Sequence, residues 1–155
     1  MRKAKKPTFS YFSHLHLHKT IVMSESGKIM SENMAAYGRR IRMNRAEHLV
    51  NKSIEAAFAK HPLYSQDGKG DNADILVKYF NPYGRGTWYV LEADPINNGE
   101  DYELYGLADL GDGPEYGYFR LSELQGYVYK LRNGYPVGGI ERDMYFGKKK
   151  VKDIK

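Results

Sequence analysis

TWYVLEADP, residues 87–95, begins as an aromatic and aliphatic run and ends with two carboxylates and a proline. Aromatic and β-branched residues favour strands, and apolar side chains at both alternating positions indicate a strand that is covered on both faces. Trp88 is therefore predicted to be a core residue. The acidic end allows two interpretations. The strand leaves the sheet through a solvated turn, or its carboxylates belong to a functional rim.

Turn-forming segments separate this stretch from further predicted strands. Asn-Pro and two glycines precede it at 81–86, and PINNGED follows it at 95–101. Because such links are only about 6 or 7 residues long, neighbouring strands are predicted to pair antiparallel. The predicted strands cover 73–80, 87–94, 101–109 and 115–121, with a loop at 132–139 and a last short strand at 140–146.

Two predicted helices pack against these strands. Residues 33–60 carry apolar residues at the spacing of one buried helical stripe, with Asn33 as a candidate N-cap, and Pro62 stops the helix. A capping box that starts at Ser122 predicts a second, short helix. The predicted fold is a small α+β domain, in which a four- to five-stranded, mostly antiparallel sheet is packed by one N-terminal helix and a short C-terminal helix.

Charge is distributed unevenly along the 155 residues, whose net charge is +5. Residues 1–60 carry 12 basic and 4 acidic side chains, whereas residues 92–123 carry 9 acidic side chains and one arginine. This segregation predicts a basic arm and an acidic edge. The predicted organisation is a flexible, basic, His-containing extension at 1–32, a single domain at 33–147 and a frayed basic tail at 148–155.

Composition restricts the cellular setting. The chain has no cysteine, which excludes disulfides, thiolate nucleophiles and cysteine-based zinc sites and fits a reducing compartment. No apolar run approaches the roughly 18 residues that a membrane helix needs. The basic N-terminus is followed by neither a clean apolar core nor a small-residue cleavage site, so we expect a cytoplasmic protein without membrane contact.

No motif indicates an enzyme or a bound cofactor. GKGDN at 68–72 lacks the pattern of a phosphate-binding loop, and no serine lies in a nucleophile-elbow sequence. His14, His16 and His18 would share one face of an extended segment, and they are weak candidate ligands for zinc or copper because a metal site needs converging geometry and supporting partners. We therefore expect no cofactor and favour a non-enzymatic role.

Six blocks of sequence occur in an order that resembles a known family. They are PLYSQ (62–66), KYFNP (78–82), TWYVLEADP (87–95), YELYGLAD (102–109), EYGYFRLSEL (115–124) and GIERDMYF (139–146). Together they resemble the Domain of Unknown Function 2958 family, small proteins of plasmids, conjugative elements and phages. The resemblance covers residues 62–146 and implies a mobile-element setting. It implies no activity, because none is established for the family as a whole.

Basic side chains carry the leading functional hypothesis, a non-enzymatic binding module that contacts nucleic acid or another anionic partner through a basic arm. The arm is predicted to comprise Arg39, Arg40, Arg42 and Arg45 together with Lys148, Lys149 and Lys150. A solvated basic helix face is the alternative interpretation of the arginines.

Five acidic residues near strand ends carry the second hypothesis: Glu92, Asp94, Asp109, Asp112 and Glu115. Carboxylates in turns often hydrogen-bond their own backbone and face solvent, which is the plainest interpretation. Alternatively, the acidic rim 92–115 docks or inhibits a protein, such as a host DNA-binding or defence protein. A third, weaker hypothesis is a metal-dependent hydrolase, because Mg²⁺ prefers carboxylate ligands. The lysine that a common nuclease would place behind Glu92 or Asp94 is missing.

Two further patterns have structural interpretations. Glu141, Arg142 and Asp143 are predicted to form a charge network, since an arginine between two carboxylates often makes bidentate pairs. The 14 tyrosines are predicted to take half-buried sheet positions, with their rings packed and their hydroxyls wet. A platform on which nucleic-acid bases stack is the alternative.

Overall fold

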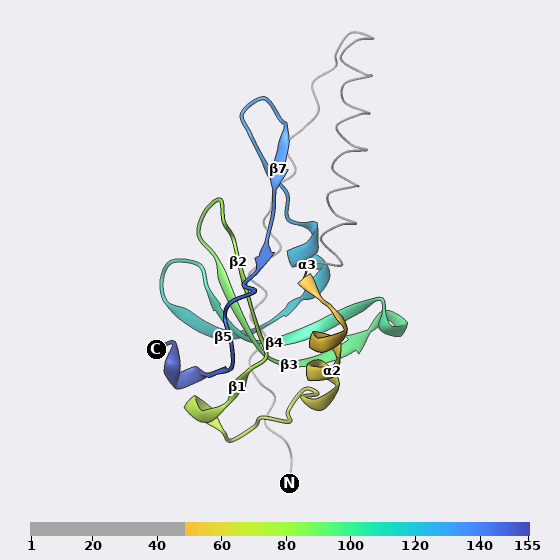
Figure 1. The fold of residues 1–155 in the computed structure, drawn as a ribbon, viewed down its shortest axis with the longest axis vertical. Coiled ribbons are helices and arrows are strands. Elements are labelled where there is room, and N and C mark those ends of the chain that lie inside the picture. Colours follow the sequence, from red (N-terminus) through yellow and green to blue (C-terminus); the bar gives the residue numbers. More distant parts are fainter. Residues whose placement is uncertain (1–48) are drawn as a thin grey trace.

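The computed structural model describes residues 49–155, and its centre is an antiparallel sheet with the strand order β5-β4-β3-β2-β8 (Figure 1). The strands are β2 (Val77–Phe80), β3 (Thr87–Ile96), β4 (Asp101–Asp109), β5 (Pro114–Arg120) and β8 (Glu141–Arg142). Two helices, α2 (Lys52–Lys60) and α3 (Leu121–Gly126), accompany the sheet. The predicted α+β class with an antiparallel sheet is confirmed.

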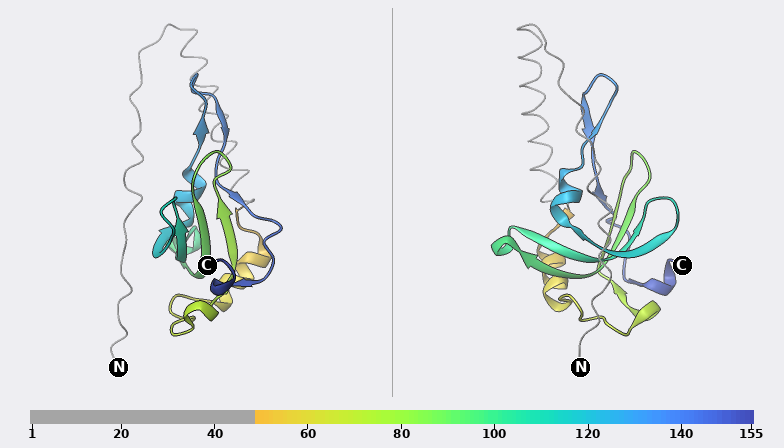
Figure 2. Two further views of the ribbon diagram at one scale, coloured as in Figure 1. Left: turned by 90° about the vertical axis from the view of Figure 1, so that its left-hand side faces the viewer. Right: turned by 180° about the vertical axis from the view of Figure 1, so that it is seen from behind.

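Short strand pairs and 3-10 turns complete the described part of the fold. β1 (Asp74–Ile75) pairs with β9 (Lys149–Lys150), and β6 (Tyr129–Lys130) pairs with β7 (Pro136–Gly138). The 3-10 turns are η1 (Gly70–Asn72), η2 (Asn97–Gly99) and η3 (Val151–Asp153). The β6–β7 hairpin projects away from the sheet in all views (Figures 1 and 2). Within residues 49–155, no helix has the length and apolar composition needed to cross a bilayer.

One face of the sheet packs against both helices and holds the larger core cluster. Alternate strand residues meet Phe58 of α2 and Leu121 of α3 there. Tyr79 is fully buried in this cluster and donates its hydroxyl to the carbonyl of Leu49 at 2.9 Å. Trp88 is 4 % exposed, which confirms its predicted core position. Apolar burial therefore holds the helices on this face.

A β-bulge in β3 changes which side chains reach the opposite face. The pairing between β3 and β4 shifts between Val90 and Glu92, so that Leu91 is the extra residue. Val90 and Ala93 belong to the helix-side core, whereas Leu91 packs in a second cluster on the other face. Because alternation resumes one residue late, Glu92 lies on the same face as Leu91.

The second face is covered by the end of the chain. Ala73, Ile75, Leu91 and Leu107 form its core cluster with Val151, which is fully buried. β9 brings Val151 there by pairing with β1. The tail predicted to be frayed instead pairs with β1 at 149–150 and buries Val151, because an apolar valine follows the lysines and has a core cluster to join.

The helix α2 begins at Lys52, directly after an N-cap at Asn51. Asn51 has extended backbone angles, φ −128° and ψ 172°, and its side chain accepts the N–H of Ile54 at 3.0 Å. This cap interrupts the helix predicted for 33–60, because the residue at an N-cap is not itself helical. α2 ends at Lys60, as the proline at 62 predicts. Residues 33–48, including Asn33, lie outside the described part of the chain.

Three predicted strand or loop boundaries are wrong. The strand predicted for 73–80 is two strands, separated at Leu76, whose N–H donates to the carbonyl of Val90 at 2.8 Å. The strand predicted for 140–146 is limited to β8, and the loop predicted for 132–139 contains β7. The pairing partner decides where each strand begins and ends, and for β1 and β8 that partner is distant in sequence.

The cap of α3 also comes from a distant residue. Ser122 lies inside α3, which begins at Leu121, so the predicted cap at Ser122 is wrong. Asp101, at the start of β4 and 7 % exposed, accepts the N–H of Ser122 at 3.0 Å and its hydroxyl at 2.6 Å. Glu123 accepts the N–H of Arg120 at 3.2 Å. Two carboxylates therefore satisfy the N–H groups at the start of this helix.

Candidate protein-interaction surface

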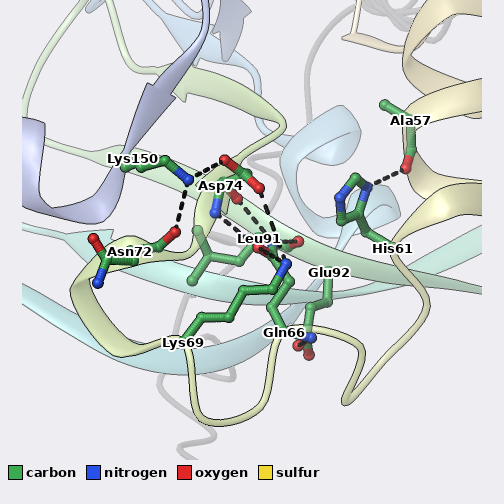
Figure 3. Close-up of polar contacts among 9 residues, drawn as sticks. All are labelled: Ala57, His61, Gln66, Lys69, Asn72, Asp74, Leu91, Glu92 and Lys150. Atoms are coloured by element: carbon green, nitrogen blue, oxygen red, sulfur yellow. Dashed lines mark hydrogen bonds and ion pairs between the residues drawn. The ribbon is translucent and has the colours of Figure 1, made fainter.

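Glu92 is a buried anchor for the segment that follows α2. Its side chain is 1 % exposed. One carboxylate oxygen accepts the N–H of Tyr64 at 2.8 Å. The other accepts the N–H of Gln66 at 2.7 Å (Figure 3). Tyr64 has a positive φ of 73°, which costs energy for a residue with a side chain and needs such local support. Glu92 thus fixes the backbone of the segment 62–66.

Gln66 ties the same segment to two strands. Its amide nitrogen donates to the carbonyls of Asp74 at 2.8 Å and Leu91 at 2.6 Å, and its amide oxygen accepts the N–H of Asp74 at 2.7 Å (Figure 3). Gln66 is 5 % exposed, so these bonds replace water that it has lost. Asp94 adds a longer contact by accepting the N–H of Leu63 at 3.2 Å.

These contacts correct the predicted role of Glu92. A carboxylate that is 1 % exposed is neither a solvated turn residue nor part of an exposed docking rim. β3 also continues to Ile96 instead of leaving the sheet after Asp94. The bulge at Leu91 is the physical reason, since it turns Glu92 toward the segment 62–66.

A row of tyrosines extends from Glu92 toward the outer strand of the sheet. Glu92 pairs with Tyr105 across β3 and β4, and Tyr105 pairs with Tyr118 across β4 and β5. The ring centroids of Tyr105 and Tyr118 are 5.0 Å apart, and those of Tyr105 and Tyr116 are 6.1 Å apart. Burial raises the pKa of Tyr118 well above its usual value, and a hydrogen bond with Tyr64 raises it further. The three tyrosines of the row are half-buried, as predicted for tyrosines in the sheet.

β5 is the long outer strand of the five-stranded sheet, since the opposite edge strand, β8, has only two residues. Its register with β4 is unbroken from Pro114 to Arg120. No strand within residues 49–155 pairs with its other side, and no backbone hydrogen bond of the described turns and loops reaches 114–119. An edge strand presents outward N–H and C=O groups at every second residue.

Acidic residues surround this strand. Those that are exposed or half-buried are Glu100, Glu103, Asp109, Asp112, Glu115 and Glu123. Asp109 accepts the N–H of Gly111 at 2.8 Å, which confirms the local turn interpretation for this residue. Arg120 is the only basic residue between positions 92 and 123. We call β5 with these six carboxylates the acidic edge.

The predicted basic arm is divided. Arg39, Arg40, Arg42 and Arg45 lie outside the described residues. Lys148 and Lys149 are exposed. Lys150 is partly buried and donates to Asp74 at 2.8 Å and to the carbonyl of Asn72 at 3.0 Å (Figure 3).

Lys150 lowers the pKa of Asp74, so their ion pair favours the folded state above the usual aspartate pKa near 4. That contribution is lost as the pH falls through the lowered pKa of Asp74. Much of the charge of Lys150 is thus engaged within the fold.

The predicted charge network of Glu141, Arg142 and Asp143 does not form among the described residues. Asp143 instead pairs with Lys78 at 2.9 Å, and Lys78 lowers its pKa. Arg142 turns its guanidinium toward the sulfur of Met144, and Glu141 is exposed. The β2–β8 pairing explains this arrangement, since it places Asp143 beside Lys78, to whose carbonyl Asp143 donates its N–H at 3.0 Å.

No metal centre is assembled among residues 49–155, where no group of three or more His, Asp or Glu side chains is placed to hold an ion. Glu92 and Asp94, the two acids closest to a metal-ligand pattern in the sequence, instead accept backbone N–H groups. His14, His16 and His18 lie outside the described residues.

A comparison with protein-family models places the chain in a family. The model described as "Protein of unknown function (DUF2958)" matches residues 49–152. The chain belongs to the DUF2958 family. The match extends the sequence resemblance in both directions, to include α2 and the packed C-terminal strand β9. No curated protein and no solved structure matches the chain.

The DUF2958 match contains both the segment anchored by Glu92 and the acidic edge. Sequence reasoning missed the anchor, although one signal was present: Glu92 lies between Leu91 and Ala93 inside an apolar strand, where a solvated carboxylate is unexpected. The open side of β5 has no sequence signal, because strand order follows from pairing between distant segments.

Proposed function

We propose that this DUF2958 protein is a non-enzymatic protein-binding module, in which β5 receives an extended, lysine- or arginine-rich segment of a partner as an added strand. The observation that carries the proposal is a regular seven-residue edge strand, unpaired among the described residues and surrounded by carboxylates. Strand addition is a common mode of peptide recognition, in which the backbone gives affinity and alternate side chains give specificity.

The tyrosine row supports a basic occupant. Tyr116 and Tyr118 lie on the same face of β5, so every second side chain of an added strand would lie about 4.5–5.5 Å from them. A lysine or arginine at such a position would contact a tyrosine ring as a cation–π pair. Lys155 already lies 5.8 Å from the ring centroid of Tyr116 in this way. The surrounding carboxylates would attract the same cations and repel an acidic segment.

A host DNA-binding protein fits this description, because such proteins often carry basic arms. The family resemblance implies a mobile-element setting, in which a protein of the element would meet host proteins. The proposed partner is therefore a host DNA-binding protein. The acidic-rim hypothesis is thereby changed from the rim 92–115 to β5 and the carboxylates around it. Glu92 and Asp94 are no longer included, because both accept backbone N–H groups of the segment 62–66.

Reversing two charges at the acidic edge is expected to weaken binding of a basic peptide by about tenfold, since each exposed ion pair contributes about 0.2–1 kcal/mol and reversal adds repulsion. The peptide alternates lysine with valine or threonine over nine positions, and the variant is Asp112→Lys with Glu115→Lys. Fluorescence anisotropy of the labelled peptide measures the affinity. Backbone amide NMR shifts identify the contacted strand, which we expect to be β5.

The matched control reverses two exposed acids elsewhere, Glu55→Lys on α2 and Glu141→Lys on β8. It should leave the affinity within about threefold of wild type, because salt screens charges that lie beyond about 10 Å. A peptide with proline at alternate positions should not bind, since proline cannot donate to the ladder. Equal weakening by both variants, or amide shifts confined to other strands, would contradict the proposal.

Nucleic-acid binding through the basic arm is a second proposal, supported by the charge balance between two parts of the chain. Residues 1–48 carry 10 basic and 3 acidic side chains, a net charge of +7, whereas residues 49–155 carry 14 and 16, a net charge of −2. The positive charge available for phosphates therefore lies mainly in residues 1–48.

Replacing Arg39, Arg40, Arg42 and Arg45 with alanine is expected to flatten the salt dependence of DNA binding. If all four contact phosphates, the slope of log affinity against log salt should fall in magnitude by about 3–4. Fluorescence anisotropy with labelled single- and double-stranded DNA over a salt series measures this slope. Alanine at Lys148 and Lys149 gives the contribution of the exposed tail lysines. An unchanged slope after the four arginine replacements would refute a phosphate-binding arm.

A further inference from the structure

A polar pocket of about 350 Å³ lies between the β2–β3 hairpin and the β4–β5 loop. The hairpin and the loop extend side by side from the sheet (Figures 1 and 2). The residues that line the pocket include two cations, Lys78 and Arg85, together with Phe80, Thr87, Asp109 and Gly111. The volume lies within the range of about 300–1,000 Å³ that is typical of small-molecule sites.

Arg85 belongs to the β2–β3 hairpin and also contacts the β4–β5 loop. Asn81 donates its side-chain amide to the carbonyl of Arg85 at 3.2 Å. The guanidinium lies against Gly111, where a Cβ atom would be only 2.8 Å from Cδ and Nη1 of Arg85. The φ of 117° at Gly111 is a backbone conformation that favours glycine. The guanidinium thus lies at the pocket beside Gly111, on a side chain that is exposed to solvent.

The guanidinium has unused binding capacity. No ion pair among the described residues involves Arg85. Lys78 donates one hydrogen bond to Asp143 at 2.9 Å, and an ammonium group has three N–H donors. The pocket thus offers the planar fork of an arginine and the remaining donors of a lysine. This pair suits the several oxygens of a phosphate dianion better than one carboxylate, which a single arginine already satisfies.

The other residues that line the pocket indicate which chemical group would carry the phosphate. Asp109 uses one carboxylate oxygen for the N–H of Gly111, which leaves the other for a donor on a ligand. Thr87 supplies a hydroxyl that both donates and accepts. Sugar hydroxyls can donate to Asp109 and exchange hydrogen bonds with Thr87. A ligand that placed a negatively charged group beside Asp109 would be repelled. Phe80 gives an apolar wall for a ring.

We propose that this pocket binds a phosphorylated sugar, free or as part of a nucleotide, with the phosphate at Arg85 and Lys78 and the sugar hydroxyls at Asp109 and Thr87. The site shares Asp109 with the acidic edge, whereas Lys78, Arg85 and Thr87 do not belong to that edge. A variant at Arg85 therefore tests the pocket and leaves strand binding at β5 measurable.

Isothermal titration calorimetry of the full chain with ribose 5-phosphate and with adenosine monophosphate tests the proposal. We expect saturable binding of at least one of them. Arg85→Ala should weaken it by at least about tenfold, because charge-assisted hydrogen bonds to phosphate are lost. Arg85→Lys should give a smaller loss, since lysine keeps the charge but not the fork. Arg132→Ala is the matched control, because Arg132 is an exposed arginine outside this pocket, and it should bind as wild type does.

The other outcomes also decide the matter. Binding of the nucleotide alone supports the nucleotide form of the ligand, and binding of both probes supports the sugar phosphate as the common element. Equal affinity for unphosphorylated ribose would overturn the role of Arg85 and Lys78, and equal affinity for inorganic phosphate would overturn the role of the sugar. No heat from either phosphorylated probe at millimolar concentration, or unchanged affinity in Arg85→Ala, would refute the site. Circular dichroism of each variant confirms that the fold is retained.

Discussion

Replacing Glu92 with glutamine is expected to lower the free energy of unfolding by about 2–3 kcal/mol. The two oxygens of Glu92 accept different N–H groups, those of Tyr64 and Gln66. A glutamine has the same shape but only one acceptor oxygen, so its NH₂ group would face one of these donors. Two charge-assisted hydrogen bonds, each contributing about 1.5–3 kcal/mol, become one neutral bond and one unsatisfied contact. The neutral amide is easier to bury, which offsets part of the loss.

Urea unfolding followed by circular dichroism gives the change in stability, with Glu115→Gln as the matched control. Glu115 is exposed, and the same chemical change there should alter stability by less than about 0.5 kcal/mol. Hydrogen exchange adds a local measure, because the amides of Tyr64 and Gln66 should lose protection before those of the core strands. Equal stability of wild type and Glu92→Gln would show that these N–H groups find other partners.

Sequence reasoning predicted the strands whose limits depend on local pattern. β4 occupies 101–109 as predicted, and β5 differs from its prediction by one residue at each end. The limits of these strands can be read from the local sequence, because alternating apolar residues are bounded by links rich in glycine, asparagine and proline. The sheet and both helices follow from such patterns, so the α+β class was predictable.

The features that build the candidate sites depend on contacts between distant segments. The bulge at Leu91 follows from pairing with β4, and without it Glu92 would lie on the helix side of the sheet. Asp101 caps α3 from another strand, although Ser122 satisfies the local capping pattern. Arg85 meets Gly111 only because two hairpins end side by side. The order of residue types along the chain does not reveal these contacts. For this reason the sequence predicts an exposed rim position for Glu92, which is buried.

Replacing Val151 with aspartate is expected to destabilise the fold by about 3 kcal/mol or more, because a carboxylate there would lose its water without gaining a partner. Val151 is fully buried against Ala73, Ile75, Leu91 and Leu107. An alternative response is that the end of the chain detaches, which avoids burying the charge but exposes this cluster to water. The free energy of detachment therefore sets an upper limit on the loss.

Thermal and urea unfolding of Val151→Asp and of the control Lys152→Asp measure this effect. Lys152 is the next residue and is exposed, so its replacement should change stability by less than about 0.5 kcal/mol. Hydrogen exchange distinguishes the two responses, because detachment would remove protection at β1 and β9 while the strands β3 and β4 stay protected. Equal stability of the two variants would mean that the C-terminal lysines are free in solution, as their composition alone predicts. A large difference means that burial of Val151 is needed, beside the β1–β9 pairing and the ion pair of Lys150, to hold this basic segment on the sheet, and that its lysines reach a partner from that fixed position.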